Sequence, residues 1–323
     1  MDKDEYFIHI SKILDEAVNR SRTNTEGTVA DYIPELAQVD VNKVSSSIML
    51  SDGQMVSHGD DDHVFTLQSV AKLVVLIALL EDYGQAKVFS WINAEPSGYH
   101  FSSISQLELF GAIPSNPMLN AGAIALCSHI PGDLQERATW LDTWIEKLFG
   151  SQLKVNGKVF ASERATSDKN RSIAYLLKSN GVLALPVEEV LETYCYLCSY
   201  ECDTKLASYL AVLLSNGGQA PNGTRVLSEE TVNIVVSIMA TCGLYDESGM
   251  HLVRTGMPAK SGVSGLMIAI ATGRGGIAVS SPLLNKKGGS VRGHMIIGHI
   301  SKELGWHFAS PWGYTRVDSG EKV

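Results

Sequence analysis

The 323-residue sequence lacks several features that would point to particular classes of protein. Its 26 Lys and Arg residues are outnumbered by 35 Asp and Glu residues, and no basic run offsets the formal net charge of −9. A nucleic-acid partner is therefore not expected. No uninterrupted apolar run reaches the roughly 18 residues that a membrane-spanning helix needs, so we expect no membrane association. The start, Met1-Asp2-Lys3-Asp4-Glu5, is acidic and has no apolar region behind it, which argues against a signal peptide.

Cysteine is scarce, and its number is odd. Five cysteines in a chain of this length fit a reducing cytoplasm better than a disulfide framework, so we expect a cytoplasmic protein. The spacing of Cys195, Cys198 and Cys202 is one that zinc and redox sites also use. The same spacing follows one face of a helix, and we favour a buried stripe of thiols there. His58 and His63 bracket an acidic loop, which we interpret as solvated because no third spaced metal ligand follows.

The composition is that of an ordinary soluble globular protein, with 45% hydrophobic and 19% charged residues. Apolar positions at helical spacing predict an amphipathic helix over residues 5–20. Pro34 plausibly occupies the first turn of a short helix. Two short runs, 46–50 and 54–58, flank Ser51-Asp52-Gly53 and predict a β-hairpin.

The middle of the chain, from residue 85 to 239, reads as helical with loops. Gly84 and Asn216-Gly217-Gly218 are predicted helix stops, and Thr166-Ser167-Asp168 is a predicted N-cap cluster. After residue 262 the pattern changes, and a second hairpin, a closing helix and a polar, loose tail from Ser310 are predicted. The predicted helices of the middle region cover residues 105–109, 121–127, 135–149, 168–178, 186–202, 203–214 and 228–240, the hairpin strands cover 265–271 and 276–280, and the closing helix covers 291–304.

These elements predict an α+β protein. The simplest assembly is a mostly antiparallel sheet, built from both ends of the chain and covered by the terminal helices, beside a helical region. We expect one domain over residues 1–323, with a sheet subdomain at about 1–64 and 250–323 and a helical subdomain at about 65–249. The cleft between the two layers would hold residue Ser69, which starts the buried segment described next.

A possible catalytic pair lies in the stretch Phe65-Thr66-Leu67-Gln68-Ser69-Val70-Ala71-Lys72. If Ser69 starts a helix, Lys72 lies one turn further on the same face, where hydroxyl and amine can exchange a proton. The following segment, 74–80, is apolar nearly all round and should be buried, which would hold the pair rigidly. Serine acyl-transfer enzymes of the penicillin-recognising type use this S-x-x-K pattern. Alone, this four-residue pattern is weak, and a capped core helix is the favoured interpretation.

Lys260-Ser261-Gly262, ahead of a predicted strand, is the second piece of such a site. Penicillin-recognising enzymes carry a Lys-Thr/Ser-Gly on the strand that walls the active site, and a glycine there lets a substrate approach the backbone. The third expected piece, a Ser-x-Asn or Tyr-x-Asn between the two, does not occur in this chain. That absence argues against a β-lactamase or a penicillin-binding protein.

Longer motifs point to another family. They run in a fixed order from about residue 25 to 300, and together they resemble the serine-dependent glutaminase family. The motifs are DYIPELA at 31–37, LQSVAK at 67–72, NPMLNAGA at 116–123, SER at 162–164 with DKN at 168–170, TCGLYDESG at 241–249 and PAKSGVSG at 258–265. The segments GSVRG at 289–293 and GLM at 265–267 depart modestly from the family pattern.

The resemblance implies a β-lactamase/transpeptidase-like fold and hydrolysis of L-glutamine to L-glutamate and ammonia, with no metal or organic cofactor. Ser69 would be the nucleophile and Lys72 its general base, with Tyr245 relaying protons and Tyr32 as a second active-site tyrosine. The backbone N–H groups of Ser69 and Val263 would form the oxyanion hole. Substrate recognition would fall to Ser69, Asn120, Glu163, Asn170, Tyr194, Tyr245 and Val263. The resemblance also implies a homodimer or homotetramer.

Some of these residues have plainer interpretations when each is taken alone. Tyr32 could be a packing aromatic, Glu163 half of a surface pair with Arg164, and Asn170 a residue that caps the start of a helix. A catalytically silent amino-acid sensor on the same scaffold and a β-lactam hydrolase are the alternative functions.

Overall fold

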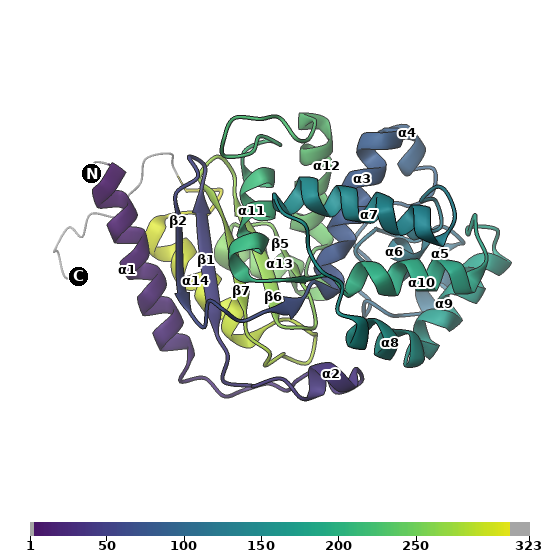
Figure 1. Cartoon of the computed structure of the whole chain (residues 1–323), viewed down its shortest axis with the longest axis horizontal. Coiled ribbons are helices and arrows are strands. Elements are labelled where there is room, and N and C mark those ends of the chain that lie inside the picture. Colours follow the sequence, from purple (N-terminus) through teal and green to yellow (C-terminus); the bar gives the residue numbers. More distant parts are fainter. Residues whose placement is uncertain (1–2, 311–323) are drawn as a thin grey trace.

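The computed structural model describes residues 3–310, and its centre is a five-stranded antiparallel sheet of order β2-β1-β7-β6-β5. β1 (Ser45–Leu50) and β2 (Met55–Gly59) form the first predicted hairpin. β5 (Ala259–Ser261), β6 (Leu266–Ala271) and β7 (Gly275–Ser280) come from the other end of the chain. β1 pairs with β7 from Ser45 opposite Ser280 to Leu50 opposite Gly275, so both ends of the chain meet in one sheet (Figure 1). The predicted α+β architecture is confirmed.

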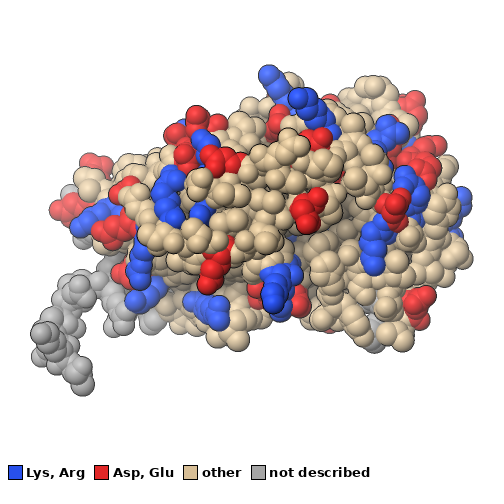
Figure 2. Space-filling view, turned by 90° about the horizontal axis from the view of Figure 1, so that it is seen from below, with Lys and Arg blue, Asp and Glu red and all other residues tan. Residues whose placement is uncertain are grey.

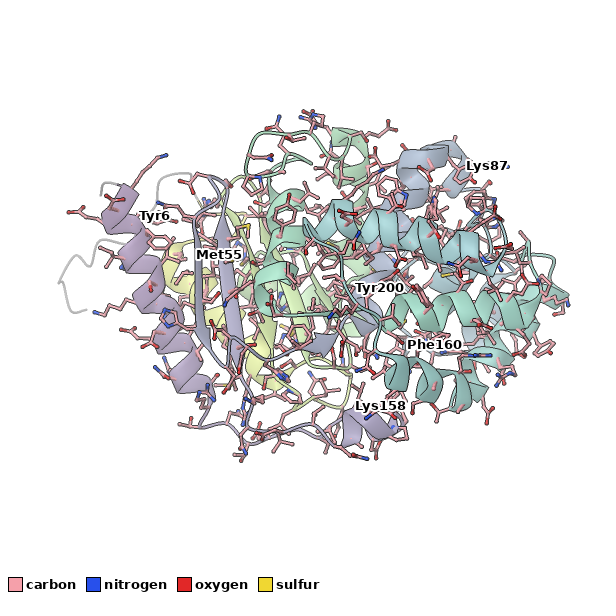
Figure 3. The ribbon with its side chains drawn as sticks, in the orientation of Figure 1. Tyr6, Met55, Lys87, Lys158, Phe160 and Tyr200 are labelled. Carbon is pink, nitrogen blue, oxygen red and sulfur yellow. The ribbon has the colours of Figure 1, made fainter. Side chains whose placement is uncertain are left out.

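Helices cover both faces of this sheet. The terminal helices α1 (Lys3–Ser21) and α14 (Val291–Leu304) pack on one face, and α11 (Thr204–Ser215) packs on the other. Tyr6 lies on the side of α1 next to the sheet (Figure 3), where its phenol accepts a hydrogen bond from the Trp306 indole at 3.2 Å. β6 and β7 are buried along their whole length, as strands between two helical layers must be. Gly276 permits the contact with α11, because a Cβ there would lie 2.3 Å from the Val212 nitrogen.

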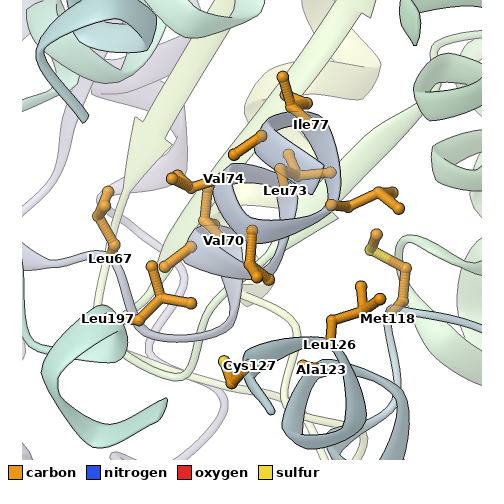
Figure 4. Packing of buried hydrophobic residues seen from close by; sticks show 14 of the residues in the cluster. Leu67, Val70, Leu73, Val74, Ile77, Met118, Ala123, Leu126, Cys127 and Leu197 are labelled. Carbon is orange, nitrogen blue, oxygen red and sulfur yellow. The ribbon is translucent and has the colours of Figure 1, made fainter. Parts of the chain in front are cut away.

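The other helices form a second layer beside the sheet (Figure 1). At its centre α3 is buried from Lys72 to Leu80, and its apolar side chains share one core cluster with residues such as Met118, Leu126 and Leu197 (Figure 4). Phe160 points from α8 toward α10, where its ring meets that of Tyr196 edge-on at 6.0 Å (Figure 3). The helices of this layer are α3 (Lys72–Tyr83), α4 (Gln85–Val88), α5 (Ser105–Phe110), α6 (Asn120–Cys127), α7 (Leu134–Phe149), α8 (Gly157–Ala165), α9 (Asp168–Ser179), α10 (Val187–Cys198) and α12 (Glu229–Cys242).

Short elements join the two layers. β3 (Phe65–Thr66) pairs with β4 (Glu201–Cys202), and the 3₁₀ turn η1 (Gln68–Ala71) follows β3 directly. The 3₁₀ turn η2 (Tyr245–Glu247) leads into α13 (Ser248–Thr255). The helix α2 (Pro34–Ala37) has Pro34 in its first turn, as predicted.

Three predictions need correction or lie outside the description. The helix predicted over 186–202 ends at Cys198, because Cys202 pairs with Phe65 in a β-ladder that the local pattern does not reveal. Cys195 and Cys198 therefore share a helix while Cys202 does not, although all three are buried and free. Ser167 occupies the N-cap position of α9, but its hydroxyl donates to the Arg164 carbonyl oxygen and does not cap the helix. The predicted tail falls mainly on residues 311–323, outside the described residues.

The surface charge and the length of the helices concern nucleic-acid and membrane partners. The lower face of the molecule carries acidic and basic side chains interspersed (Figure 2). Within residues 3–310, no helix is both long and apolar enough to span a bilayer.

Candidate active site

Ser69 lies on η1, between a strand and a buried helix. The turn runs directly into α3, so Ser69 precedes Lys72 by one turn, as the S-x-x-K spacing predicts. Gln68, just before Ser69, has φ 47°, and Tyr245 has φ 58°; within residues 3–310 these are the non-glycine residues with positive φ. Such a backbone conformation costs on the order of 1–3 kcal/mol. The strain of the described backbone is therefore concentrated around Ser69.

Tyr245 lies between Ser69 and a second lysine. The Ser69 hydroxyl is near enough to the Tyr245 phenol to oppose the rise in its pKa. Lys260, which is fully buried on β5, donates from Nζ to the Tyr245 phenol oxygen at 3.2 Å and to the Ser261 carbonyl oxygen at 2.6 Å. Burial is the cause of this rise in the pKa of Tyr245. Burial, followed by the nearby positive charge of Lys72, holds the pKa of Lys260 well below its usual value.

Lys72 begins a chain of hydrogen bonds that leads to the pocket wall. Its Nζ donates to the Met118 carbonyl oxygen at 2.9 Å and to Asn120 Oδ1 at 2.7 Å. Asn120 Nδ2 donates in turn to Asn170 Oδ1 at 2.8 Å. The ammonium is fully buried, and burial lowers the pKa of Lys72 to about 7. A substantial share of the Lys72 side chains is thus neutral near neutral pH and able to accept a proton.

The local sequence explains how Asn120 reaches Lys72. Asn116 Oδ1 accepts hydrogen bonds from the N–H groups of Met118 and Leu119 and thereby fixes the turn that starts α6. Gly122 allows α6 to lie against this turn, because a Cβ there would lie 2.0 Å from the Asn116 carbonyl oxygen. The turn and the glycine together place Asn120 in the first position of α6.

A pocket of about 300 Å³ opens in front of Ser69. Glu163 on α8 is only 8% exposed, and its burial raises the pKa of this carboxyl to about 7, against the effects of a hydrogen bond with Gln68 and the charge of Lys72. Tyr194 is buried at the wall, whereas Tyr32 is 52% exposed at the rim. The pocket is lined by Tyr32, Ser69, His100, Phe101, Ser102, Asn120, Glu163, Thr166, Ser167, Lys169, Asn170 and Tyr194.

Gly262 brings the segment after β5 close to the backbone of Ser69. A Cβ on Gly262 would lie 2.7 Å from the Leu67 carbonyl oxygen and 3.5 Å from the Ser69 nitrogen, so glycine lets β5 approach η1 closely. Val263 follows directly and is partly exposed. Among the hydrogen bonds of residues 3–310, none uses the N–H of Ser69 or of Val263.

The structure gathers the residues that the sequence analysis named. Six of them line the pocket, Lys72 is hydrogen-bonded to one of these, and Tyr245 lies near Ser69. Sequence reasoning treated Lys260 as part of a motif without naming it as a site residue, and it missed Gln68 and the lining segment 100–102. The Lys-Ser-Gly motif was a usable signal for Lys260, because Lys260 and Ser261 share the strand β5. In the part of the chain that the structure describes, no group of three or more His, Cys, Asp or Glu residues is placed to hold a metal ion.

Comparison with known proteins gives a consistent result. The family model for glutaminase matches residues 27–308. A glutaminase from Legionella pneumophila (strain Corby) is 50% identical over 302 residues, which cover 93% of this chain and 97% of that protein. The solved structure of a probable glutaminase, ybaS, has a TM-score of 0.90 at 36% identity and covers 94% of this chain and 98% of its own. The structure of Mglu in its glutamate form has a TM-score of 0.87 at 33% identity and covers 92% and 69% of the two chains.

Proposed function

The chain belongs to the glutaminase family, with its β-lactamase-like fold, and from this premise we propose that it hydrolyses L-glutamine to L-glutamate and ammonia through an acyl-enzyme on Ser69. The observation that carries the proposal is the pocket that Ser69 shares with the buried carboxyl of Glu163 and the amides of Asn120 and Asn170. An amino-acid substrate needs one anion for its ammonium and neutral donors for its carboxylate, and this pocket offers both.

Glutamine would bind with its two charged groups toward the helical side of the pocket. The Glu163 carboxylate accepts from the substrate ammonium, and the gain from this charged contact offsets the cost of burying the carboxylate. Asn120 and Asn170 hold one another's amides in fixed orientation, which directs the Asn170 amide N–H donors toward the substrate carboxylate. Tyr194 forms the buried wall, and Tyr32 stands over the rim. The side-chain carboxamide then reaches Ser69.

In the acylation step, Ser69 Oγ attacks the carboxamide carbon. The hydroxyl proton passes to the neutral amine of Lys72, and the oxygen that becomes negative is bound by the N–H groups of Ser69 and Val263. The tetrahedral intermediate collapses as the C–N bond breaks. The nitrogen receives a proton through Tyr245 and leaves as ammonia, and a γ-glutamyl ester of Ser69 remains. Lys260 donates a hydrogen bond to the Tyr245 oxygen and thereby stabilises the phenolate that this step leaves.

In the deacylation step, water attacks the ester carbon. The Tyr245 phenolate accepts the proton of the water, and the same two N–H groups bind the oxyanion. As the ester C–O bond breaks, the Lys72 ammonium returns its proton to Ser69 Oγ. Glutamate leaves and the Ser69 hydroxyl is restored. The net change is the addition of one water to one glutamine, which releases one glutamate and one ammonia.

The decisive experiment measures ammonia release from glutamine and from asparagine by the purified protein. Ser69→Ala should abolish ammonia release without lowering the melting temperature. Ser208→Ala is the matched control, since Ser208 is a buried serine of α11 whose hydroxyl donates to the Lys205 carbonyl oxygen at 2.7 Å. Added hydroxylamine should trap the acyl group as γ-glutamyl hydroxamate with the wild type only. Turnover that survives in Ser69→Ala would disprove the mechanism, and a chromogenic β-lactam tests the β-lactam hydrolase alternative.

We further propose that the protein works in the cytoplasm as a homodimer or homotetramer. The five free, buried thiols support a reducing compartment. Light scattering on the purified protein measures the assembly state, and a monomer at micromolar concentration would refute that part of the proposal.

A further inference from the structure

The loop of residues 24–41, here called the strap, crosses between the two layers. After α1 the chain runs along the lower edge of the molecule to α2 and then returns to β1 (Figure 1). α2 packs against α8, the helix that carries Glu163. Tyr32, just ahead of α2, lines the pocket in front of Ser69. The strap therefore carries a pocket residue although both its ends lie on the sheet side.

Both ends of the strap are fastened by one buried side chain, Arg292 of α14. Its Nε donates to the Asn24 carbonyl oxygen at 2.8 Å, and its Nη1 donates to the Val41 carbonyl oxygen at 2.7 Å. A third, longer bond of 3.4 Å reaches the Ser281 hydroxyl. Arg292 is only 2% exposed, and these partners are two carbonyls and a hydroxyl, with no carboxylate among them. Burying a guanidinium whose hydrogen-bond partners are all neutral costs free energy. We therefore expect its two bonds to the ends of the strap to have a function.

The strap also packs against Val263. Thr28 and Leu284 exchange two backbone hydrogen bonds of 2.9 and 2.8 Å. Beyond this bridge, a small apolar cluster is formed by Ala30, Ile33, Leu36 and Leu284, and Val263 packs against it. The strap thus contacts Val263 through this apolar cluster and also places Tyr32 at the pocket.

We propose that Arg292 is a positioning residue for the reaction, because by tying the two ends of the strap it fixes Tyr32 over the pocket and keeps the apolar cluster pressed against Val263. This inference rests on the proposed roles of Tyr32 and Val263. Arg292 lines no part of the pocket, so its effect is indirect. Small displacements of positioning groups are known to cost up to about 100-fold in rate.

The test compares Arg292→Lys with Tyr32→Phe and with the double variant. Arg292→Lys keeps the charge but cannot reach both carbonyls, and it should lower kcat/KM for glutamine at least about 10-fold. Hydrogen exchange should rise in residues 24–41. Arg137→Lys is the control. Arg137 of α7 is equally buried but bonds to Gly132, just before α7, and to Glu189 on α10, so its replacement should leave exchange in the strap unchanged.

The double variant separates a positioning role from a structural one. If Arg292 acts through Tyr32, Arg292→Lys should cost much less in the Tyr32→Phe background than in the wild type. Fully additive losses, or a fall in melting temperature with unchanged kcat/KM, would overturn the inference. Wild-type activity of Tyr32→Phe would instead overturn the proposed role of Tyr32, and with it the inference. Should Arg292→Lys fold poorly, Ile33→Ala loosens the strap at its apolar seat, and the same cycle with Tyr32→Phe decides.

Discussion

The dependence of activity on pH gives the sharpest test of the proposed site. The productive free enzyme needs neutral Lys72 to accept a proton and ionised Glu163 to bind the substrate ammonium. Burial brings the pKa of both groups to about 7, from opposite directions. Because each group must lose a proton, log kcat/KM should rise below pH 7 with a limiting slope of 2. At pH 5 about 1% of each group is in the required form, so kcat/KM should be about 10⁴-fold below its plateau.

Glu163→Gln removes one of the two titrations. The limiting slope should fall to 1, and the loss at pH 5 relative to the variant's own plateau should shrink to about 100-fold. The midpoint should also move to lower pH, because the Glu163 charge raises the pKa of Lys72 and the variant lacks it. The plateau itself should drop by about 10- to 100-fold, since a charged hydrogen bond is worth about 1.5–3 kcal/mol.

The assay is initial-rate ammonia release at low glutamine concentration between pH 4.5 and 9, with Ser208→Ala as the control profile. The two groups interact, so the wild-type curve reports the pair and not each residue separately. A wild-type slope of 1 that Glu163→Gln leaves unchanged would refute the reasoning. A midpoint that moves to higher pH in the variant would refute it as well.

Three other substitutions test separate parts of the site. Ser248→Ala should lower kcat about 10- to 100-fold with little change in KM. The Ser248 hydroxyl accepts from the Leu244 N–H at 2.9 Å and donates to the Tyr245 carbonyl oxygen at 3.0 Å, and these bonds hold the strained turn at Tyr245. Ser248→Thr, which keeps the hydroxyl, should recover activity. Gly262→Ala should lower both the melting temperature and the activity, whereas Gly298→Ala, where a Cβ meets nothing within 4 Å, should change neither appreciably. Lys260→Met should abolish turnover yet raise the melting temperature at pH 7, because the wild-type amine is protonated in the unfolded chain but releases this proton when it is buried. The gain in melting temperature should shrink toward pH 10. A gain independent of pH would contradict a lowered pKa of Lys260.

The periodic parts of the fold could be predicted from the sequence. The bounds predicted for α14 agree with the structure, and both hairpins lie within a residue or two of their predicted ranges. These elements are specified locally, by helical spacing or by turn residues such as Ser51-Asp52-Gly53. β3 and β4 could not be predicted, because each is two residues long and is defined by a partner far along the chain. The helix predicted through Cys202 failed for the same reason.

The same distinction between local and long-range signals applies to the residues of the site. The one-turn spacing of Ser69 and Lys72 follows from the sequence and is present in the structure, where the Lys72 amine is hydrogen-bonded to Met118 and Asn120. That Asn120, Glu163, Asn170 and Tyr194 share one pocket follows from no spacing in the sequence; it came only from the family resemblance. The role of Arg292 had no sequence signal, since its partners are backbone carbonyls, which every residue carries.

The positive φ angles of Gln68 and Tyr245 have a consequence for attempts to make the protein more heat-resistant. Glycine adopts these angles without steric penalty, so screens that reward thermal survival alone would be drawn to Gln68→Gly and Tyr245→Gly. Both replacements would delete side chains that contact Glu163 or Ser69. Such a screen would enrich thermally stable variants that no longer release ammonia. Selection for thermal stability and selection for turnover should therefore favour different residues at these two positions.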